Sequence, residues 1–350
     1  MGMQIKQPEW EKVEYSRKRI ERAGKEIISG SISDEEKKEA VAVIDNWRAA
    51  HAYPLHYIYM NLKKYAVDDK NIIVAQRLKR LDSIVDKLKR FSTMNLWKMQ
   101  DLGGCRVIVS EIGDVYKYRD KFKNSRIRHI LKKENDYISS PKTTGYRSLH
   151  MVYEYHSDSN DEYNRHMLIE IQFRTHLQHL WATAVETMGL FTNVAIKSGR
   201  GSEEVNRFFA LISSLFAMNE GCPIVPGTPE DMDEIIHEVE SLNARNNYLG
   251  YLSGIRVATK QEEDNVKYKD NERCVLSLDY DKHELSIKRF KPSDISLANE
   301  YYNKLENQKG NDRTDNVLVR VSSFARLREA YPNYFADIGK FVGVVKGYLK

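Results

Sequence analysis

The spacing of apolar positions divides the chain into a helical first part and a later part in which strands alternate with helices. Residues 8–65 predict mostly helix, with Ser33 as an N-cap and Pro54 as an interruption. Residues 76–91 predict the most amphipathic helix, because their apolar positions recur every three or four residues. Those apolar positions are Leu78, Leu81, Ile84, Val85, Leu88 and Phe91.

The period of the pattern changes to two at Cys105, which indicates strands with one buried face. The predicted strands cover residues 105–110, 135–139, 148–155 and 167–173. Helices are expected at 175–190, 203–219 and 230–246, with a turn rich in proline and glycine at 221–231. From residue 248 the pattern predicts strands at 253–259, 274–280, 283–290 and 316–322, and helices at 293–307 and 322–331. We therefore predict an α+β fold with two domains, residues 1–247 and residues 248–350.

Composition favours a cytoplasmic protein with a substantial hydrophobic core. The chain is 41% hydrophobic and 30% charged, and no apolar run reaches the roughly 20 residues of a membrane span. Its first residues lack the apolar segment of a secretory signal. The cysteines are few and widely spaced (Cys105, Cys222 and Cys274), which argues against a disulfide framework and against a zinc finger.

Charge is distributed unevenly, although the net charge is only +5. Residues 51–150 carry 21 Lys and Arg against 10 Asp and Glu, whereas residues 201–250 carry 2 against 9. The first stretch predicts either a surface for a polyanion, such as a nucleotide or RNA, or an ordinary solvated basic face.

The predicted helix at 76–91 carries cations and a hydroxyl opposite its apolar face, within an arc of roughly 80°. Such a cluster suits a triphosphate, because charge-assisted hydrogen bonds to phosphate are strong. An exposed basic face without a ligand is the alternative. The residues on and beside this face are Arg77, Lys79, Arg80, Ser83, Lys87 and Arg90.

Asp101 precedes two glycines and a strand, a place where backbone can approach a phosphate. An aspartate beside a glycine turn is a candidate metal ligand, and capping of the turn is its alternative role. Arg106 lies on one face of the strand that follows, together with Ile108.

The loop 142–150 and the strand after it gather further chemistry. Gly145 permits a backbone conformation that other residues resist, and Tyr146 beside it can stack on a base. The basic residues of the loop that can reach phosphate or sugar oxygens are Lys142, Arg147 and His150. Alternation directs Met167, Ile169, Ile171 and Phe173 inward, and it places Glu170, Gln172 and Arg174 on the other face. Glu170 is a candidate metal ligand or base, while a half-exposed strand with routine polar residues is the alternative.

His176 and His179 lie three residues apart on the next predicted helix. A zinc site would need a third ligand, and no residue has convincing spacing, so we expect a structural or RNA-contacting role. The sequence shows no nucleophilic Ser or Cys motif and no P-loop pattern.

Four of these motifs, in this order, resemble the synthetase domain of the RelA/SpoT family over roughly residues 40–190. They are Arg77-x-Lys79 with Ser83 and Lys87, then Asp101-Leu-Gly-Gly-Cys-Arg106, then Tyr137-Ile with Pro141-Lys142 and Gly145-Tyr146-Arg147-Ser148-Leu149-His150, and then Glu170-Ile-Gln172-Phe-Arg174-Thr175. Each motif is weak alone, whereas the four in sequence are specific.

The resemblance implies a nucleotidyltransferase-like mixed sheet flanked by helices. It implies transfer of pyrophosphate from ATP to a ribose 3′-hydroxyl, with release of AMP. By position, Asp101 and Glu170 would hold Mg²⁺, and Glu170 would help to deprotonate the hydroxyl. The ATP-binding residues that it implies are Arg77, Lys79, Arg80, Ser83, Lys87 and Arg106, with Arg77 and Arg106 enclosing the adenine. The acceptor-binding residues that it implies are Lys142, Tyr146, Arg147, His150, Gln172 and Arg174.

Two departures from the family pattern bear on the activity. Thr144 stands where the family usually has Asn, which affects the expected recognition of guanosine. No His-Asp hydrolase motif precedes the synthetase region, so we do not expect hydrolysis of alarmones, nor the long regulatory tail of the ribosome-bound members.

Two further segments resemble a narrower group. Asn46-Trp47-Arg48 with Tyr53-Pro54 is similar to the toxic small alarmone synthetases, and Tyr331-Pro-Asn-Tyr334-Phe335 is similar to the pseudo-zinc-finger antitoxin domain of CapRel-type fused toxin–antitoxins. This resemblance implies modification of the 3′ CCA end of tRNA, which stops translation. It also implies that Tyr331 and Tyr334 block ATP binding until a phage protein releases them. We further expect both tyrosines to compete for the contacts of Tyr146 and Arg147; packing at a helix end is their alternative role.

Three functions stay open on the sequence. The first is a pyrophosphokinase acting on tRNA and inhibited by its own C-terminal domain. The second is a (p)ppGpp synthetase acting on GDP or GTP. The third is a non-catalytic RNA-binding sensor, which the intact Asp101 and Glu170 disfavour. The expected partners are tRNA or a guanosine nucleotide, Mg²⁺, ATP and a phage protein, with no membrane, in a monomer or small homo-oligomer.

Overall fold

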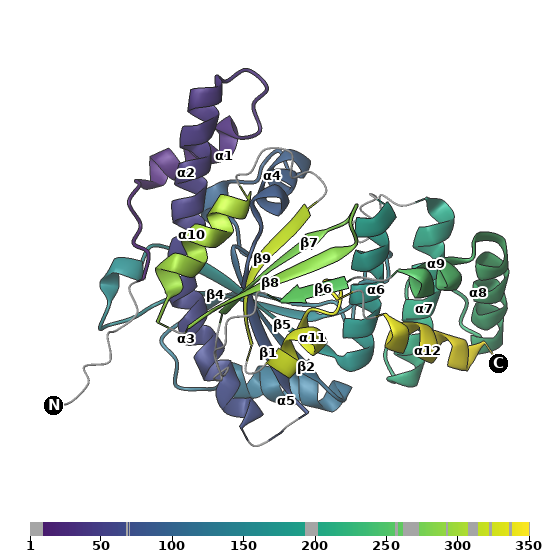
Figure 1. Ribbon diagram of the computed structural model, residues 1–350. Coiled ribbons are helices and arrows are strands. Elements are labelled where there is room, and N and C mark those ends of the chain that lie inside the picture. Colours follow the sequence, from purple (N-terminus) through teal and green to yellow (C-terminus); the bar gives the residue numbers. More distant parts are fainter. Residues whose placement is uncertain are drawn as a thin grey trace.

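A nine-stranded sheet runs through the molecule, with helices packed on both faces and a group of helices at one side (Figure 1). The computed structural model describes residues 10–67, 69, 71–192, 202–255, 258–261, 273–291, 293–306, 314–321, 324–335 and 338–349. Within these residues no helix combines the length and the apolarity that crossing a bilayer requires. The predicted α+β class is confirmed.

The strands of the sheet follow the order β3-β4-β5-β2-β1-β9-β7-β8-β6. The pairs β2–β5 and β6–β8 are parallel, and the other neighbouring pairs are antiparallel. Their bounds are β1 Ile73–Leu78, β2 Gly103–Val109, β3 Ile130–Asp136, β4 Leu149–Glu154, β5 Leu168–Thr175, β6 Ala258–Gln261, β7 Arg273–Asp279, β8 Glu284–Phe290 and β9 Thr314–Val321.

The helices are α1 Arg17–Glu26, α2 Asp34–Ala50, α3 Ala52–Lys63, α4 Leu81–Arg90, α5 Ile112–Lys123, α6 His176–Thr192, α7 Glu203–Asn219, α8 Met232–Asn246, α9 Tyr248–Gly254, α10 Ile295–Glu306, α11 Phe324–Ala330 and α12 Gly339–Tyr348. In the described part of the chain, three single-turn 3₁₀ segments accompany them, at Lys64–Ala66, Leu96–Lys98 and Asp161–Tyr163. Helix α2 begins at the predicted N-cap: the Ser33 side chain accepts from the amide of Glu36 at 3.2 Å, and the Glu36 carboxylate accepts from the amide of Ser33 at 2.8 Å.

Each face of the sheet has its own apolar core. Under α3 and α5, the alternate β5 residues Ile169, Ile171 and Phe173 are buried together with residues of β2 and β4. On the opposite face, strands β1, β7 and β9 bury apolar side chains against Tyr331 and Tyr334. The polar face of β5 is therefore the face that the C-terminal residues cover, and the predicted alternation in β5 is confirmed.

The strands that follow residue 248 extend the same sheet that the earlier strands build. Strand β9 pairs with β1, with Gln76 opposite Arg320 and Arg77 opposite Val319. Helix α12 returns to the helical group and packs against α6 and α9 (Figure 1). The division near residue 247 stays a prediction; in the structure Asn247, with a φ of 50°, forms the bend between α8 and α9.

Three predicted elements are wrong at their starts. The strand expected at 135–139 begins already at Ile130 and ends at Asp136, where a turn follows. The helix expected at 76–91 begins only at Leu81, because residues 76–78 belong to β1 and pair with strands on both sides. Pairing between strands outweighs the local amphipathic pattern there. The strand expected at 253–259 begins within α9, whose Leu249 and Leu252 are buried in the helical group. Helices α5, α9 and α12 were not expected.

Candidate active site

Strands β4, β5, β2 and β1 place polar side chains in register on one face of the sheet. Glu170 on β5 lies opposite Gly104 on β2, which in turn lies opposite Arg77 on β1. Gln172 and Arg106 occupy the next row in the same way. A cavity of about 50 Å³ opens on these rows, and it is lined by Ala75, Arg77, Lys79, Asp101, Gly104, Cys105, Arg106, Glu170, Gln172 and Tyr331.

Asp101 holds two lysines at the edge of this cavity. Lys79 Nζ lies 3.0 Å from one carboxylate oxygen, and Lys87 Nζ lies 2.9 Å from the other. Burial alone would raise the pKa of Asp101, but the two ammonium groups hold it well below its usual range. Asp101 is therefore ionised, and it joins the segment before α4 to the last turn of that helix.

Glu170 belongs to a closed ring of five hydrogen-bonded side chains. His150 Nδ1 donates to one Glu170 oxygen at 2.9 Å, and Gln172 Nε2 donates to the other at 2.6 Å. Arg174 donates to Gln172 and, at 3.3 Å, to the hydroxyl of Tyr146. That hydroxyl lies 2.8 Å from His150 Nε2, which closes the ring. The orientation of Glu170 is thus fixed from both sides.

The two carboxylates are suited to a magnesium ion. Burial would raise the pKa of Glu170, but His150 lowers it below its ordinary value, so Glu170 is ionised like Asp101. In phosphoryl-transfer sites Mg²⁺ is held by one or two carboxylates together with substrate phosphates. Among the described residues there is no cluster of three or more His, Cys, Asp or Glu able to enclose a metal. Asp101 and Glu170 therefore fit an ion that is bound jointly with a nucleotide.

The arginines expected to enclose adenine lie beneath the C-terminal residues. Arg106 donates to the carbonyl oxygen of Ala330 at 3.0 Å, and its guanidinium lies 5.9 Å from the centre of the Tyr331 ring. The Tyr331 hydroxyl donates to the carbonyl oxygen of Gln76 at 2.8 Å. Burial, reinforced by the nearby Arg174 and Arg77, lowers the pKa of Arg106 to about 10.

Arg77 and Arg80 face the second tyrosine and two acidic residues. Burial would lower the pKa of Arg77, but Glu186 and then Tyr334 raise it above its ordinary value. Arg80 forms an ion pair with Asp315 on β9, whose side chain is only 1% exposed. Ser83 lies half-buried one turn into α4, outside the residues that line the cavity. The C-terminal part of the chain thus engages three of the arginines expected to bind ATP.

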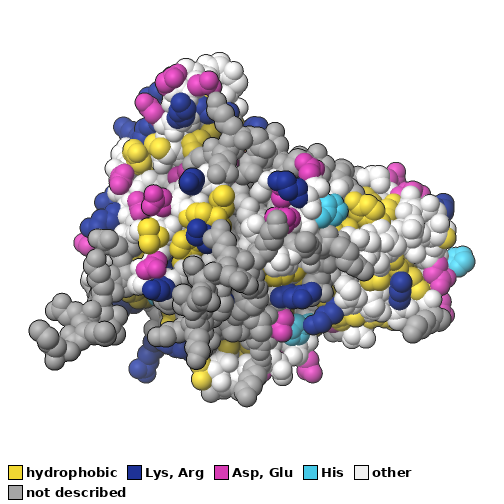
Figure 2. All heavy atoms as spheres, in the orientation of Figure 1, with side chains coloured by type: hydrophobic (Ala, Val, Ile, Leu, Met, Phe, Trp, Pro, Cys, Tyr) yellow, Lys and Arg dark blue, Asp and Glu magenta, His cyan; other side chains and the backbone are white. Residues whose placement is uncertain are grey.

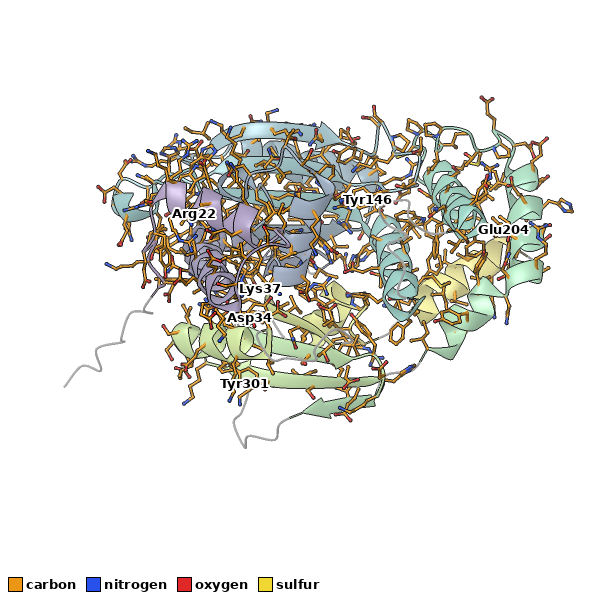
Figure 3. All side chains as sticks on the ribbon, turned by 90° about the horizontal axis from the view of Figure 1, so that it is seen from above. Arg22, Asp34, Lys37, Tyr146, Glu204 and Tyr301 are labelled. Carbon is orange, nitrogen blue, oxygen red and sulfur yellow. The ribbon has the colours of Figure 1, made fainter. Side chains whose placement is uncertain are left out.

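Several acceptor-binding predictions need correction. Arg147 is buried and donates to Ser213 Oγ at 3.0 Å and to the carbonyl oxygen of Ile138 at 3.3 Å, so its guanidinium serves the core instead of a phosphate. Tyr146 is only 6% exposed and packs with the helical group beside the sheet, as Figure 3 shows, so no open ring face awaits a base. His150 has both nitrogens engaged within the ring of side chains.

The two C-terminal tyrosines do not meet the acceptor loop as expected. Tyr331 contacts Gln76 and Arg106, on the side of the cavity where ATP-binding residues were predicted. The predicted competition for the contacts of Tyr146 and Arg147 is therefore wrong, because Tyr146 already bonds His150 and Arg147 already bonds Ser213.

Two residues of the site had no role in the sequence prediction. Tyr137, which belongs to the third motif, lies beside Lys142, whose ammonium is 4.2 Å from the ring centre, and its ring is more exposed than that of Tyr146. Ser213 on α7 accepts from Arg147 and donates to the carbonyl oxygen of Gly145 at 2.6 Å, which holds the loop. These hydrogen bonds join residues that lie 66 and 68 positions apart in the chain, so a local sequence pattern cannot predict them.

His179 has a structural contact, in line with one of its expected roles. Its Nε2 lies 3.0 Å from the carbonyl oxygen of Glu329 on α11. Burial, with Arg106 and Arg174 nearby, holds the pKa of His179 well below its usual range, so the ring is neutral and donates this bond. On the face of the molecule that Figure 2 shows, Lys and Arg side chains lie interspersed with Asp and Glu side chains.

Comparisons with known proteins point to one family for the region that carries these motifs. Residues 76–190 match the family model described as "Region found in RelA / SpoT proteins". The GTP pyrophosphokinase YwaC of Bacillus subtilis (strain 168) is 35% identical over 112 residues, which make up 31% of this chain and 52% of that protein. The GTP pyrophosphokinase YjbM of the same organism is 29% identical over 155 residues, 42% of this chain and 72% of that protein. The chain thus spans about half the length of the first of these relatives.

Solved structures give a weaker likeness. Small alarmone synthetase 2 from Bacillus subtilis is 24% identical, with a TM-score of 0.43 over 50% of this chain and 93% of that chain. A GTP pyrophosphokinase family protein from Streptococcus pneumoniae is 23% identical, with a TM-score of 0.42 over 57% of this chain and 93% of that chain. The similarity to the RelA/SpoT region therefore rests on the sequence match at residues 76–190, where Asp101 and Glu170 lie.

Proposed function

We propose that this chain is an ATP-dependent pyrophosphokinase. The observation that carries the proposal is the convergence of Asp101, with its two lysines, and Glu170 on one cavity. In the reaction the acceptor 3′-oxygen bonds to the β-phosphorus of ATP, and the bond from that phosphorus to the oxygen shared with the α-phosphate breaks. AMP leaves with the electron pair of that bond, and Glu170 receives the hydroxyl proton.

The cations of the site supply the stabilisation that such a transfer needs. Phosphoryl transfer depends mainly on positioning and on charges that offset the negative phosphate oxygens. Lys79 lines the cavity and Lys87 bonds to Asp101, which also lines it, so both ammonium groups can neutralise those oxygens. Mg²⁺, when held by Asp101 and Glu170, would add positive charge between the phosphates. His150 and Gln172 keep Glu170 aimed at the cavity.

Two acceptors fit this proposal. Guanosine nucleotides are supported by the names of the two relatives, which are GTP pyrophosphokinases. The 3′ end of tRNA is supported by the surplus of Lys and Arg in residues 51–150 and by Thr144, which departs from the usual family residue. In either case the reacting group is a ribose 3′-hydroxyl, and the same Glu170 serves it.

We also propose that the C-terminal residues hold the enzyme inactive. The support is that Tyr331 lines the cavity and contacts Arg106, and that Tyr334 is buried in the same apolar cluster as Tyr331. Tyr331 occupies the side of the cavity where Arg106 lies, so ATP would compete with it for that place and these residues would move before catalysis. A cytoplasmic partner that binds residues 248–350, such as the phage protein implied by the CapRel resemblance, would release them.

Transfer of a radiolabel tests the activity. The full chain with Tyr331→Ala and Tyr334→Ala is incubated with γ-labelled ATP and GDP, GTP or deacylated tRNA. Label on a guanosine nucleotide identifies an alarmone synthetase, and label on tRNA identifies a tRNA-modifying enzyme. Absence of label from all three acceptors, with Glu170→Gln indistinguishable from its parent, would leave the non-catalytic RNA-binding sensor as the function.

A further inference from the structure

The amino end of α4 receives its cap from the far end of the chain. Arg80, the N-cap residue, makes no side-chain capping bond. Instead the amide of Leu81 donates to Glu306 Oε2 at 3.1 Å, across 225 residues of sequence. Helix amino ends carry unpaired N–H groups and partial positive charge, so they favour an anion at this place.

A second carboxylate meets the neighbouring residue of the same helix end. Asp315, on β9, forms an ion pair with Arg80, and its side chain is almost fully buried. Glu306 ends α10 and Asp315 lies near the start of β9, so the two carboxylates come from successive elements. Two consecutive positions at the amino end of α4 are thus held by carboxylate oxygens from the C-terminal part.

Helix α10 is held in this position by a buried arginine of α2. Arg48 is 1% exposed, donates to Asn303 Oδ1 at 2.7 Å and lies 3.7 Å from Glu306. Its guanidinium also lies 4.7 Å from the centre of the Tyr302 ring. The placement of Glu306 against Leu81 is therefore supported by a second set of contacts.

A phosphate oxygen makes the same contacts as these carboxylate oxygens. Helix amides and guanidinium groups are the donors that bind phosphates in proteins. Lys79 lies next to Arg80, and with Lys87 it meets Asp101 at the cavity. Arg80 follows Lys79 directly in the chain and Lys87 lies on α4 itself, so a triphosphate bound by those lysines would lie beside the amino end of this helix.

We propose that Glu306 and Asp315 are phosphate mimics that occupy the triphosphate side of the ATP site, separately from the cover that Tyr331 gives to the adenine side. This inference rests on the proposed function, because it assumes that ATP is the nucleotide that binds. Inhibition would then have two parts: the carboxylates of Glu306 and Asp315 at the triphosphate side, and the aromatic ring of Tyr331 at the adenine side.

Binding of two partial ligands separates these parts. Affinities of the full chain for inorganic tripolyphosphate and for adenosine are measured by calorimetry in Glu306→Gln, Asp315→Asn and the control Glu300→Gln, an exposed residue of α10. We expect the first two variants to bind tripolyphosphate roughly tenfold more tightly, since a charge-assisted contact is lost only from the closed state. Their affinity for adenosine should stay within about twofold, and Tyr331→Ala should show the opposite preference.

The proposal is overturned if both ligands tighten equally, or if tripolyphosphate affinity is unchanged in variants that melt like the wild type. Hydrogen exchange of the unmodified protein gives an independent reading should a variant fold poorly. Tripolyphosphate should speed exchange in α10 and adenosine should not; equal exchange with saturating tripolyphosphate contradicts the proposal. Neither measurement requires transfer to an acceptor, so a failed activity assay would count against the proposed function alone.

Discussion

Tyr331 donates its hydroxyl hydrogen to the backbone carbonyl oxygen of Gln76 at 2.8 Å, and this bond joins residues 255 positions apart. Gln76 lies on β1, between strands β2 and β9, so the bond fastens the C-terminal residues to the centre of the sheet. Because the Tyr331 ring lines the cavity, a change at this hydroxyl alters access to the site without touching Asp101 or Glu170.

Tyr331→Phe should weaken the attachment of the C-terminal residues to the cavity while keeping the aromatic ring. A buried hydrogen bond contributes about 1 kcal/mol, so we expect the apparent affinity for ATP to rise roughly fivefold. Tyr301→Phe, on α10 and away from the cavity, is the matched control. Equilibrium binding of ATP to the full chains checks the result, and equal affinities in both variants would show that the hydroxyl does not hold the cover.

Glu170→Gln should remove the transfer reaction and leave the fold intact. The amide keeps hydrogen-bonding capacity near His150 and Gln172, but it can neither accept the hydroxyl proton nor hold a metal as a carboxylate does. We expect the rate to fall by roughly 10²-fold or more. Glu154→Gln, on the adjacent strand β4, changes the same group outside the cavity and should keep the rate within about twofold.

Arg147→Met should act on stability instead of on the acceptor. The substitution removes the hydrogen bonds that Arg147 donates to the Ser213 hydroxyl and to the Ile138 carbonyl, which costs roughly 1–3 kcal/mol of unfolding free energy. Lys142→Met, at the exposed end of the same loop, should leave stability unchanged and raise the acceptor KM. Urea unfolding with acceptor kinetics separates the two, and an Arg147 variant of full stability would contradict this assignment.

Gly145→Ala should destabilise the loop for two reasons. Gly145 has a φ of 87°, a conformation that favours glycine, and an added Cβ would lie 2.9 Å from the Trp181 ring and 3.2 Å from the Ala210 Cα. We expect a loss of roughly 1–3 kcal/mol of unfolding free energy. Gly113→Ala, where an added Cβ meets nothing within 4 Å, should show no loss. Thermal melting of both variants gives the comparison.

His51 should make stability depend on pH below neutrality. Its ring is buried, and burial lowers the pKa of His51 to about 4, against the hydrogen bond to Trp47. In the unfolded chain His51 binds a proton near pH 6.5, whereas in the folded chain it binds one only near pH 4. Protonation between these values therefore favours the unfolded chain, and the free energy of unfolding that is present above pH 6.5 decreases as the pH falls. This group should cost about 2 kcal/mol between pH 7 and pH 5. Urea unfolding of His51→Gln should show a correspondingly flatter pH dependence, and a slope equal to that of the wild type would contradict the argument.

The sequence was most informative where local periodicity and local function coincide. The alternation in β5 correctly placed Glu170, Gln172 and Arg174 on one face, because each side of that strand meets a different environment. The same logic failed at residues 76–78, where a helical pattern lies in a strand. There, pairing with β2 and β9 determines the conformation, and these strands lie too far away in the sequence to be included in a local pattern.

Long-range pairings also explain what sequence reasoning missed in the site. Asp315 and Glu306 meet Arg80 and Leu81 only after the C-terminal strands join the sheet. Arg147 looks like its basic neighbours in the loop, and only the packing of α7 shows that its guanidinium is buried against Ser213. The residue types therefore indicated a nucleotide-binding site, whereas the fold determined which of the predicted site residues face the cavity.

Release of AMP from ATP by the full chain tests the central claim most directly. The wild type and the variant with Tyr331→Ala and Tyr334→Ala are compared with GDP, GTP or deacylated tRNA as acceptor. We expect little AMP from the wild type and acceptor-dependent AMP from the variant, and we expect Glu170→Gln to abolish that release. Equal AMP release by wild type and variant would contradict closure by the C-terminal residues, and release that survives Glu170→Gln would contradict the active site itself.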